Sequence, residues 1–209
     1  MMPPNMNSSL PTVGLIGLGA MGGGMAASLR RAGFTPHVFD VRAEVAQAFA
    51  AEGGHACPDL PSLGAACDVV ISVVVNADQT QAVLFGPDGQ SGCAAHMKPG
   101  SVFVMCSTVD PKVSVDFERR LNALGLHYLD APISGGAAKA AAGQITMMTS
   151  GTDAAYAACA GALEAMAARF TNSANRPGRG ARSKSSTNCS QGFTSRRRLR
   201  PWRSVYARG

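Results

Sequence analysis

A glycine-rich turn directly after a short apolar strand constrains this chain more than any other feature. Val13–Ile16 is typical of a buried strand, and residues 23–31 can form a helix. Three glycines at GxGxxG spacing lie between them, namely Gly17, Gly19 and Gly22. In that context they permit, in order, a tight turn, close approach to a pyrophosphate, and tight packing of helix on strand. Because the helix N-terminus would also offer free N–H groups to phosphates, the motif predicts a dinucleotide site.

Strands and helices alternate along the chain up to about Ala168. Further strands are expected at 35–39, 69–75, 102–105, 127–129 and 145–149, with a short extended piece near 55–57. Helices are expected at 42–52, 78–85, 110–125 and from 152 to about 168. Residues 69–75 are nearly all β-branched, as in a strand buried on both faces of a parallel sheet. The pattern predicts an α/β fold with a doubly wound, Rossmann-type sheet over residues 12–168.

Asp40 closes the second expected strand, about twenty residues after the glycines, where dinucleotide-binding domains carry an acidic residue. A carboxylate there can accept hydrogen bonds from both ribose hydroxyls of an adenosine and would repel a 2′-phosphate. NAD is therefore expected in preference to NADP. Arg42 weakens this inference because it could turn toward a phosphate, and a solvated turn aspartate is the structural alternative.

Two further segments follow expected strands. Residues 106–108 lie at the carboxyl end of one strand, the edge where open α/β sheets bind ligands, although a simple Ser/Thr turn would have the same sequence. In residues 130–136, two glycines after Ser134 allow N–H groups to face a small anion, and a plain turn is the alternative. Lys139 could pair with an anionic substrate or could be a solvated helix residue.

The remaining chemistry-bearing residues show no functional spacing. None of the four histidines is a convincing catalytic base: His37, His55, His96 and His127. The six cysteines have no metal-binding spacing, so we expect no metal and reduced thiols in a cytoplasmic protein. Residues 1–11 are polar and Pro-rich, so we expect them to be disordered and to lack a signal core, and no apolar run is long enough to span a membrane.

Together these stretches resemble the β-hydroxyacid dehydrogenase family. The resemblance rests on residues 17–22 with Met25 and Ala26, on Ser107 with Thr108, and on residues 130–136. Residues 74–86 and 135–141 look most like the L-threonate dehydrogenase branch. The resemblance implies hydride transfer to NAD from the hydroxyl of a small sugar acid such as L-threonate.

The same resemblance implies particular site residues. Met21 would join the three glycines and Asp40 in binding the cofactor, and Thr108 would contact its nicotinamide end. The substrate carboxylate would be held by Ser134, Gly135 and Gly136.

The sequence departs from the family at two points. Ser28 stands where the family commonly has Asn. The family's catalytic lysine, in a K-x-x-N/H-Q pattern that supplies the general acid/base, does not occur in the 209 residues, so no catalytic residue is assigned. The all-helical second domain that carries this lysine, closes the active site and supplies the dimer contacts is expected to be missing.

Residues 169–209 have a different composition from the rest of the chain. All thirteen Asp and Glu residues precede Arg169, whereas eleven Lys and Arg residues lie from Arg169 onward. The segment supports neither an amphipathic helix nor a core, and we expect it to be disordered. A basic arm for nucleic acid is one interpretation.

A shifted reading frame is the interpretation that we prefer for this tail. With synonymous codons, moving the frame back one base turns residues 184–190 into K-I-I-N-Q-L-L. Residues 191–203 then become A-G-V-H-I-A-A-A-A-E-A-M-A, which is helical and follows the family's lysine motif. If the shift is real in the organism, we expect an impaired oxidoreductase or a non-catalytic NAD(P)-binding remnant, and if it is a sequencing error, we expect an ordinary dehydrogenase of the family. A nucleic-acid-binding protein is a third class.

Overall fold

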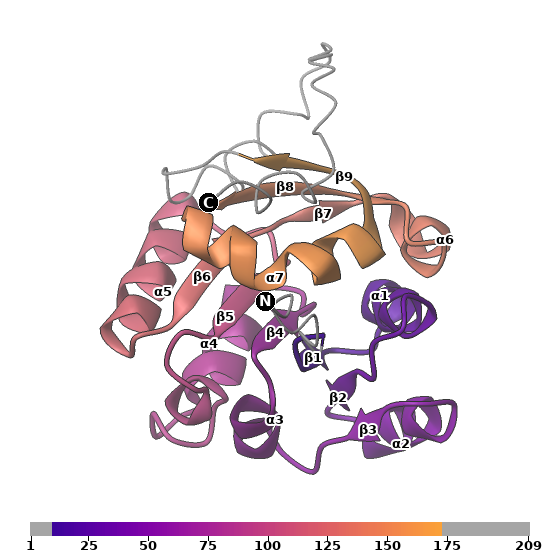
Figure 1. Ribbon diagram of the computed structural model, residues 1–209. Helices are drawn as coiled ribbons and strands as arrows, with labels where there is room; N and C mark the ends of the chain where they lie inside the picture. Colours follow the sequence, from indigo (N-terminus) through magenta and orange to yellow (C-terminus); the bar gives the residue numbers. More distant parts are fainter. Residues whose placement is uncertain (1–9, 173–209) are drawn as a thin grey trace, which may run out of the picture.

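Short apolar strands and helices alternate throughout residues 10–172, which are the residues described in the computed structural model (Figure 1). The strands are β1 Val13–Ile16, β2 His37–Phe39, β3 His55–Ala56, β4 Val69–Ser72, β5 Val102–Met105, β6 His127–Asp130, β7 Ile133–Ser134, β8 Ile145–Gly151 and β9 Ala167–Asn172. The α-helices are α1 Ala20–Arg31, α2 Ala43–Ala51, α3 Leu60–Ala66, α4 Ala77–Phe85, α5 Pro111–Ala123, α6 Gly136–Ala141 and α7 Asp153–Met166. A 3₁₀-helix, η1, covers Ala94–His96.

The sheet is wound in two directions from its first strand. Its order begins β3-β2-β1-β4-β5-β6, and each of these neighbours is parallel. Ile16 at the end of β1 aligns with Phe39 of β2 on one side and Ser72 of β4 on the other. The chain thus reverses its winding at β1, where ligand crevices form in such sheets. The predicted doubly wound α/β fold is confirmed.

Helices cover both faces of the sheet because the strand side chains alternate between two cores. Leu15 of β1 is fully buried in a core with α1 and α7, whereas Ile16 is buried in a second core with α3, α4 and α5. Figure 1 shows α1 and α7 on one side of the parallel strands and α3 to α5 on the other. Burial on both faces explains why β1, β4 and β5 are continuous apolar runs.

The last strands depart from the parallel pattern. β8 pairs antiparallel with β6 and with β7, and it pairs in parallel with β9. The helix expected to reach about Ala168 ends at Met166, and β9 then runs through Arg169 to Asn172. Residues 169–172, the first part of the segment expected to be disordered, therefore belong to β9 and pair with β8, while the rest of that segment lies outside the described residues.

Residues 1–9 and 173–209 lie outside the described residues. The expectation of a disordered N-terminus therefore falls largely outside them. Cys189 and the segment 184–203, on which the frame hypothesis depends, also fall there. Between residues 10 and 172, no helix is long and apolar enough to cross a membrane.

Candidate dinucleotide-binding site

The three glycines of the first turn meet different surroundings. Gly17 has a φ of +91°, and a Cβ added to it would lie 2.8 Å from the backbone oxygen of Val73. A Cβ added to Gly22 would overlap the carbonyl oxygen of Gly17, so α1 starts against the turn. A Cβ added to Gly19 would meet no protein atom within 4 Å. Gly17 and Gly22 are thus required by the fold, whereas Gly19 leaves an open approach to the backbone.

The N-terminus of α1 is uncapped and faces this open space. Gly19 is its N-cap residue in extended conformation, and no side chain bonds to the cap. The first turn carries no acidic residue, while Arg30 and Arg31 lie in the last turn. The first N–H groups of a helix lack intrahelical partners and carry a partial positive charge. This end of α1 is therefore suited to an anion such as a pyrophosphate.

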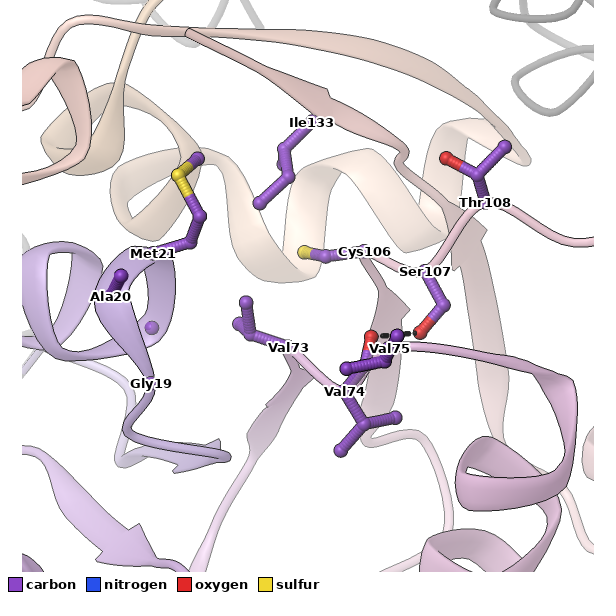
Figure 2. Close-up of a pocket in the computed structure, with 11 residues that line it drawn as sticks. Gly19, Ala20, Met21, Val73, Val74, Val75, Cys106, Ser107, Thr108 and Ile133 are labelled. Atoms are coloured by element: carbon purple, nitrogen blue, oxygen red, sulfur yellow. Dashed lines mark hydrogen bonds between the residues drawn. The ribbon is translucent and has the colours of Figure 1, made fainter. Parts of the chain in front are cut away.

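Two cavities meet at Gly19. The Thr108 cavity, of about 340 Å³, is lined by residues 19–22, 73–75 and 106–108 and by Ile133 (Figure 2). The Asp40 cavity, of about 420 Å³, is lined by Ile16, Gly17, Gly19, residues 39–42, Leu60, residues 73–75, Gln79, Ala82 and Val83. They share Gly19 and residues 73–75, which follow β4. An extended ligand lying across Gly19 could occupy both.

Asp40 is held at the wall of its cavity by a dense set of hydrogen bonds. The N–H of Leu18 donates to Oδ2 at 2.7 Å, and the N–H of Arg42 donates to Oδ1 at 3.0 Å. The Arg42 guanidinium adds bonds from Nε to Oδ1 at 3.0 Å and from Nη2 to Oδ2 at 3.3 Å. Burial acts to raise the pKa of Asp40, but these hydrogen bonds and the Arg42 charge outweigh it, and the pKa is lowered. The side chain is therefore a carboxylate at neutral pH.

Two exposed valines stand at the mouth of the Asp40 cavity. Val41, in the loop after β2, is 91% exposed, and Val75, in the loop after β4, is 80% exposed. Both line the cavity. A flat ring bound in this cavity could make apolar contact with these side chains.

In the Thr108 cavity, a buried serine places an exposed threonine. Ser107 donates from Oγ to the carbonyl of Val74 at 2.7 Å and accepts from Thr80 Oγ1 at 3.2 Å. The bond from Ser107 to the Val74 carbonyl ties the loop after β5 to the loop after β4. Figure 2 shows Thr108 at one side of the cavity and Met21 at the other, with Cys106 and Ile133 on the wall between them. The structure thus brings Gly19, Met21, Gly22 and Thr108 to one cavity.

The expected carboxylate-binding residues lie next to this cavity but do not line it. Ser134 in β7 is exposed and pairs with Thr146 of β8. Gly135 and Gly136 follow with φ angles of 142° and 79°, and both are exposed. Only their neighbour Ile133 belongs to the lining. The assignment of these three residues to a substrate site therefore stays a prediction.

Helix α6, which begins at Gly136, is fixed against α1. The Oγ of Ser28, the position where the sequence departs from the family, donates to the carbonyl of Ala140 at 2.9 Å. A Cβ added to Gly24 would lie 2.6 Å from the N atom of Ala141, so the two helices touch through their backbones. Lys139 is exposed on α6 and lines neither cavity.

The histidines and the deeply buried cysteines of residues 10–172 show no catalytic or metal-binding arrangement, and of the described cysteines only Cys106 lines either cavity. None of the four histidines lines either cavity. Burial raises the pKa of Cys67, Cys93 and Cys159 to about 12, so these thiols are unreactive. Among the described residues, no group of His, Cys, Asp or Glu could hold a metal ion.

The structure also adds lining residues that the sequence did not single out. Residues 73–75 form the wall common to both cavities, and Leu60 and Gln79 line the Asp40 cavity. Residues 73–75 come directly after β4, which neighbours β1. Their position at the carboxyl edge of the sheet, beside the first strand, could have indicated that they line the ligand site.

Comparison with known proteins agrees with this geometry. Residues 12–174 match the family described as the NAD binding domain of 6-phosphogluconate dehydrogenase. An L-threonate dehydrogenase of Cupriavidus necator is 52% identical over 157 residues, covering 75% of this chain and 52% of the relative. The chain spans about half the length of this curated relative.

Solved structures share the same arrangement. A 3-hydroxyisobutyrate dehydrogenase from Salmonella typhimurium superposes with a TM-score of 0.78 at 37% identity, covering 83% of this chain and 59% of that one. Psf3, solved with NADP⁺ and 2-OPP, superposes with a TM-score of 0.79 at 29% identity, covering 85% and 61%. With the fold, the glycine turn and the matched residues in agreement, the chain belongs to the family of the NAD-binding domain of 6-phosphogluconate dehydrogenase.

Proposed function

We propose that residues 12–172 bind NAD across the two cavities, as the cofactor domain of an oxidoreductase acting on a small hydroxy acid. The observation that carries this is the meeting of both cavities at Gly19, beside the uncapped end of α1. The pyrophosphate would lie at that helix end, close to the backbone that Gly19 leaves open. The adenosine would enter the Asp40 cavity and the nicotinamide the Thr108 cavity.

The residues of each cavity suit these assignments. Asp40 offers acceptors for a ribose diol, and Val41 with Val75 offers apolar contact for an adenine ring. Gly17 and Gly22 keep the turn and α1 in the geometry that exposes the helix N–H groups. Thr108 and Met21, which lie at opposite sides of the Thr108 cavity, would then flank the nicotinamide (Figure 2).

For the substrate we propose a small sugar acid such as L-threonate. The support is the name of the relative from Cupriavidus necator and the position of Ser134, Gly135 and Gly136 directly after Ile133 at the Thr108 cavity. Bound NAD would supply a two-electron acceptor for the hydride from the carbon that bears the hydroxyl. Backbone N–H groups of the two glycines would hold the substrate carboxylate near that acceptor.

We further propose that this 209-residue chain transfers the hydroxyl proton poorly. A group that accepts this proton commonly contributes a factor of about 10²–10⁴ to the rate. No K-x-x-N/H-Q motif occurs in the 209 residues, and none of the four histidines lines the Asp40 cavity or the Thr108 cavity. We expect NAD binding without rapid turnover, a result that both the impaired-oxidoreductase and the remnant interpretations predict.

A shifted frame before Lys184 remains our explanation for the missing motif. The support is the family-like string that the minus-one frame can encode from residue 184 to residue 203. Sequencing the DNA across this region tests it directly. Codons that do not spell K-x-x-N/H-Q in that frame would contradict the explanation and would favour a basic arm for nucleic acid.

Calorimetric titration of the 209-residue chain tests the binding proposal. NAD should bind more tightly than NADP, because the Asp40 carboxylate lies where a 2′-phosphate would come. AMP and nicotinamide mononucleotide, tested separately, should bind more weakly than NAD and without competing with each other. Absence of heat and of any change in thermal stability with either dinucleotide would refute the proposal.

A second assay addresses the chemistry. NADH formation with L-threonate, followed by absorbance, should be very slow for this chain even at saturating NAD. A kcat within the ordinary enzyme range of about 1–10³ s⁻¹ would contradict the expected impairment.

A further inference from the structure

The Arg42 guanidinium forms a two-pronged contact with Asp40 at the wall of the Asp40 cavity. Its Nε donates to one carboxylate oxygen and its Nη2 to the other. A ribose diol also presents two neighbouring donors to one carboxylate. We propose that the Arg42 side chain occupies the position on Asp40 that the ribose diol of NAD would take. NAD must therefore displace the guanidinium, whereas the displaced guanidinium can pair with the 2′-phosphate of NADP. This inference rests on the proposed function.

The remaining hydrogen bonds of Asp40 explain why the competition is direct. Each carboxylate oxygen already accepts one backbone N–H, from Leu18 on Oδ2 and from Arg42 on Oδ1. The guanidinium supplies the second donor to each oxygen. A carboxylate has about four acceptor positions, so these four bonds fill it. A diol can therefore bond there only after the two guanidinium bonds break.

Burial shows which partner moves. The Asp40 side chain is 6% exposed, whereas that of Arg42 is 54% exposed. The two backbone bonds do not depend on the guanidinium, so they would keep the carboxylate oriented after Arg42 leaves. Arginine side chains at such exposed positions break ion pairs at low cost, about 0.2–1 kcal/mol. The Arg42 side chain can therefore leave, while the Asp40 carboxylate stays in place.

The two cofactors place opposite demands on this pair. NAD bonds to Asp40 only after the contact between Arg42 and Asp40 has broken, so Arg42 opposes the binding of NAD. NADP brings a 2′-phosphate to a carboxylate that repels it, and a guanidinium freed beside it can pair with that phosphate in a bidentate manner. Arg42 therefore lowers the preference for NAD that Asp40 alone would impose.

Calorimetric titrations of the full chain with NAD and NADP separate these roles. R42A should bind NAD about two- to fivefold more tightly, the fold-change equivalent to an exposed ion pair, and NADP more weakly than the unsubstituted chain. R42K keeps the charge but cannot form the two-pronged contact, so its NAD affinity should lie between the two. R119A is the matched control, because Arg119 is a 75% exposed arginine bonded to Asp116 at 2.7 Å and lines neither cavity. It should leave both affinities unchanged.

The outcomes distinguish this inference from the proposed function. If the unsubstituted chain binds NAD and R42A binds it equally or more weakly, the competition does not exist, while the binding proposal stands. An equal gain in R119A would also overturn the inference, because it would show a general charge effect. If neither the unsubstituted chain nor R42A binds NAD or NADP, the proposed function fails and the inference with it. Thermal unfolding and the carboxyl NMR signal of Asp40 would show that each variant is folded.

Discussion

Alanine at Gly19 and alanine at Gly22 should have opposite effects, although the two glycines belong to one motif. Gly19 is extended with a φ of −64°, a conformation that alanine adopts readily, and its added Cβ meets no protein atom within 4 Å. G19A should therefore unfold near the temperature of the unsubstituted chain, since alanine restricts the unfolded chain by about 0.4–1 kcal/mol but is a poorer N-cap residue than glycine. The Cβ would, however, stand where the pyrophosphate approaches.

The expected loss in binding follows from the bonds that this Cβ would displace. A hydrogen bond to a charged group contributes about 1.5–3 kcal/mol, so loss of one such bond lowers the NAD affinity about ten- to hundredfold. At Gly22 the added Cβ overlaps the carbonyl oxygen of Gly17 and lies 3.3 Å from the Cβ of Val73. Overpacking of this kind costs about 1–3 kcal/mol, which lowers the melting temperature by roughly 3–10 °C in a domain of this size.

Calorimetric NAD titration and thermal unfolding of both variants provide the assay. G19A should be stable and weak in binding, whereas G22A should be destabilised. If G19A binds NAD as tightly as the unsubstituted chain, the phosphates do not lie against Gly19 and the placement of the cofactor is wrong. If G22A retains full stability, the turn does not pack as described.

Three further predictions concern side-chain hydrogen bonds. The pKa of Asp40 is lowered in the folded protein, so the carboxylate stabilises the fold above the ordinary aspartate pKa of about 4, and this stabilisation is lost as the pH falls through the lower folded value. The free energy of unfolding of D40N, measured in urea, should therefore depend less on pH below about 4 than that of the unsubstituted chain. S107A loses the 2.7 Å bond to the Val74 carbonyl and should lower the melting temperature by about 2–4 °C while also weakening NAD binding, and an unchanged affinity would show that the two loops are held by other contacts. S28A removes the 2.9 Å hydrogen bond to the buried carbonyl of Ala140, which keeps the N–H of Gly143 as a donor at 3.2 Å, and should cost about 0.5–1.5 kcal/mol in chemical unfolding with NAD affinity unchanged; a stability equal to that of the unsubstituted chain would be the contrary result.

The central strands could be predicted from the sequence because they are buried on both faces. β5 has the predicted bounds, Val102–Met105, and β4 begins at the predicted Val69. Strong apolar runs of β-branched residues leave no competing interpretation in an alternating chain. Asp110 and Pro111 likewise begin α5 as the capping pattern indicates, and the Asp110 side chain accepts the N–H of Lys112.

Elements whose stability depends on distant partners were missed. α3 contains a proline and a glycine, and its Gly64 packs so closely on the backbone of Cys93 that an added Cβ would overlap the Cys93 carbonyl oxygen. α6 has only six residues and is held by backbone contact with α1 through Gly24. β9 spans the change in composition at Arg169, yet it pairs with β8 along its length. Such tertiary contacts override local sequence patterns, so a pattern within one segment could not reveal them.

The candidate site was predictable in part for the same reason. Gly17, Gly19 and Asp40 belong to a turn and a strand end whose spacing is local, and the structure brings them to one cavity. The contact of Arg42 with Asp40 required the side-chain geometry, because the sequence allowed Arg42 to face either the carboxylate or a phosphate. Residues 73–75, as the wall of both cavities, depend on the order of strands β1 and β4.

Mapping of NAD onto the backbone by amide NMR tests the placement of the cofactor most directly. Titration of the ¹⁵N-labelled 209-residue chain should shift the amide signals of Gly19, Met21, Asp40 and Thr108 along one common binding curve, because one ligand would lie across both cavities. The amide of His127, which lies outside both cavities, should stay in place. Shifts confined to one cavity, separate curves for the two, or no shift at saturating NAD would contradict a dinucleotide lying over the start of α1.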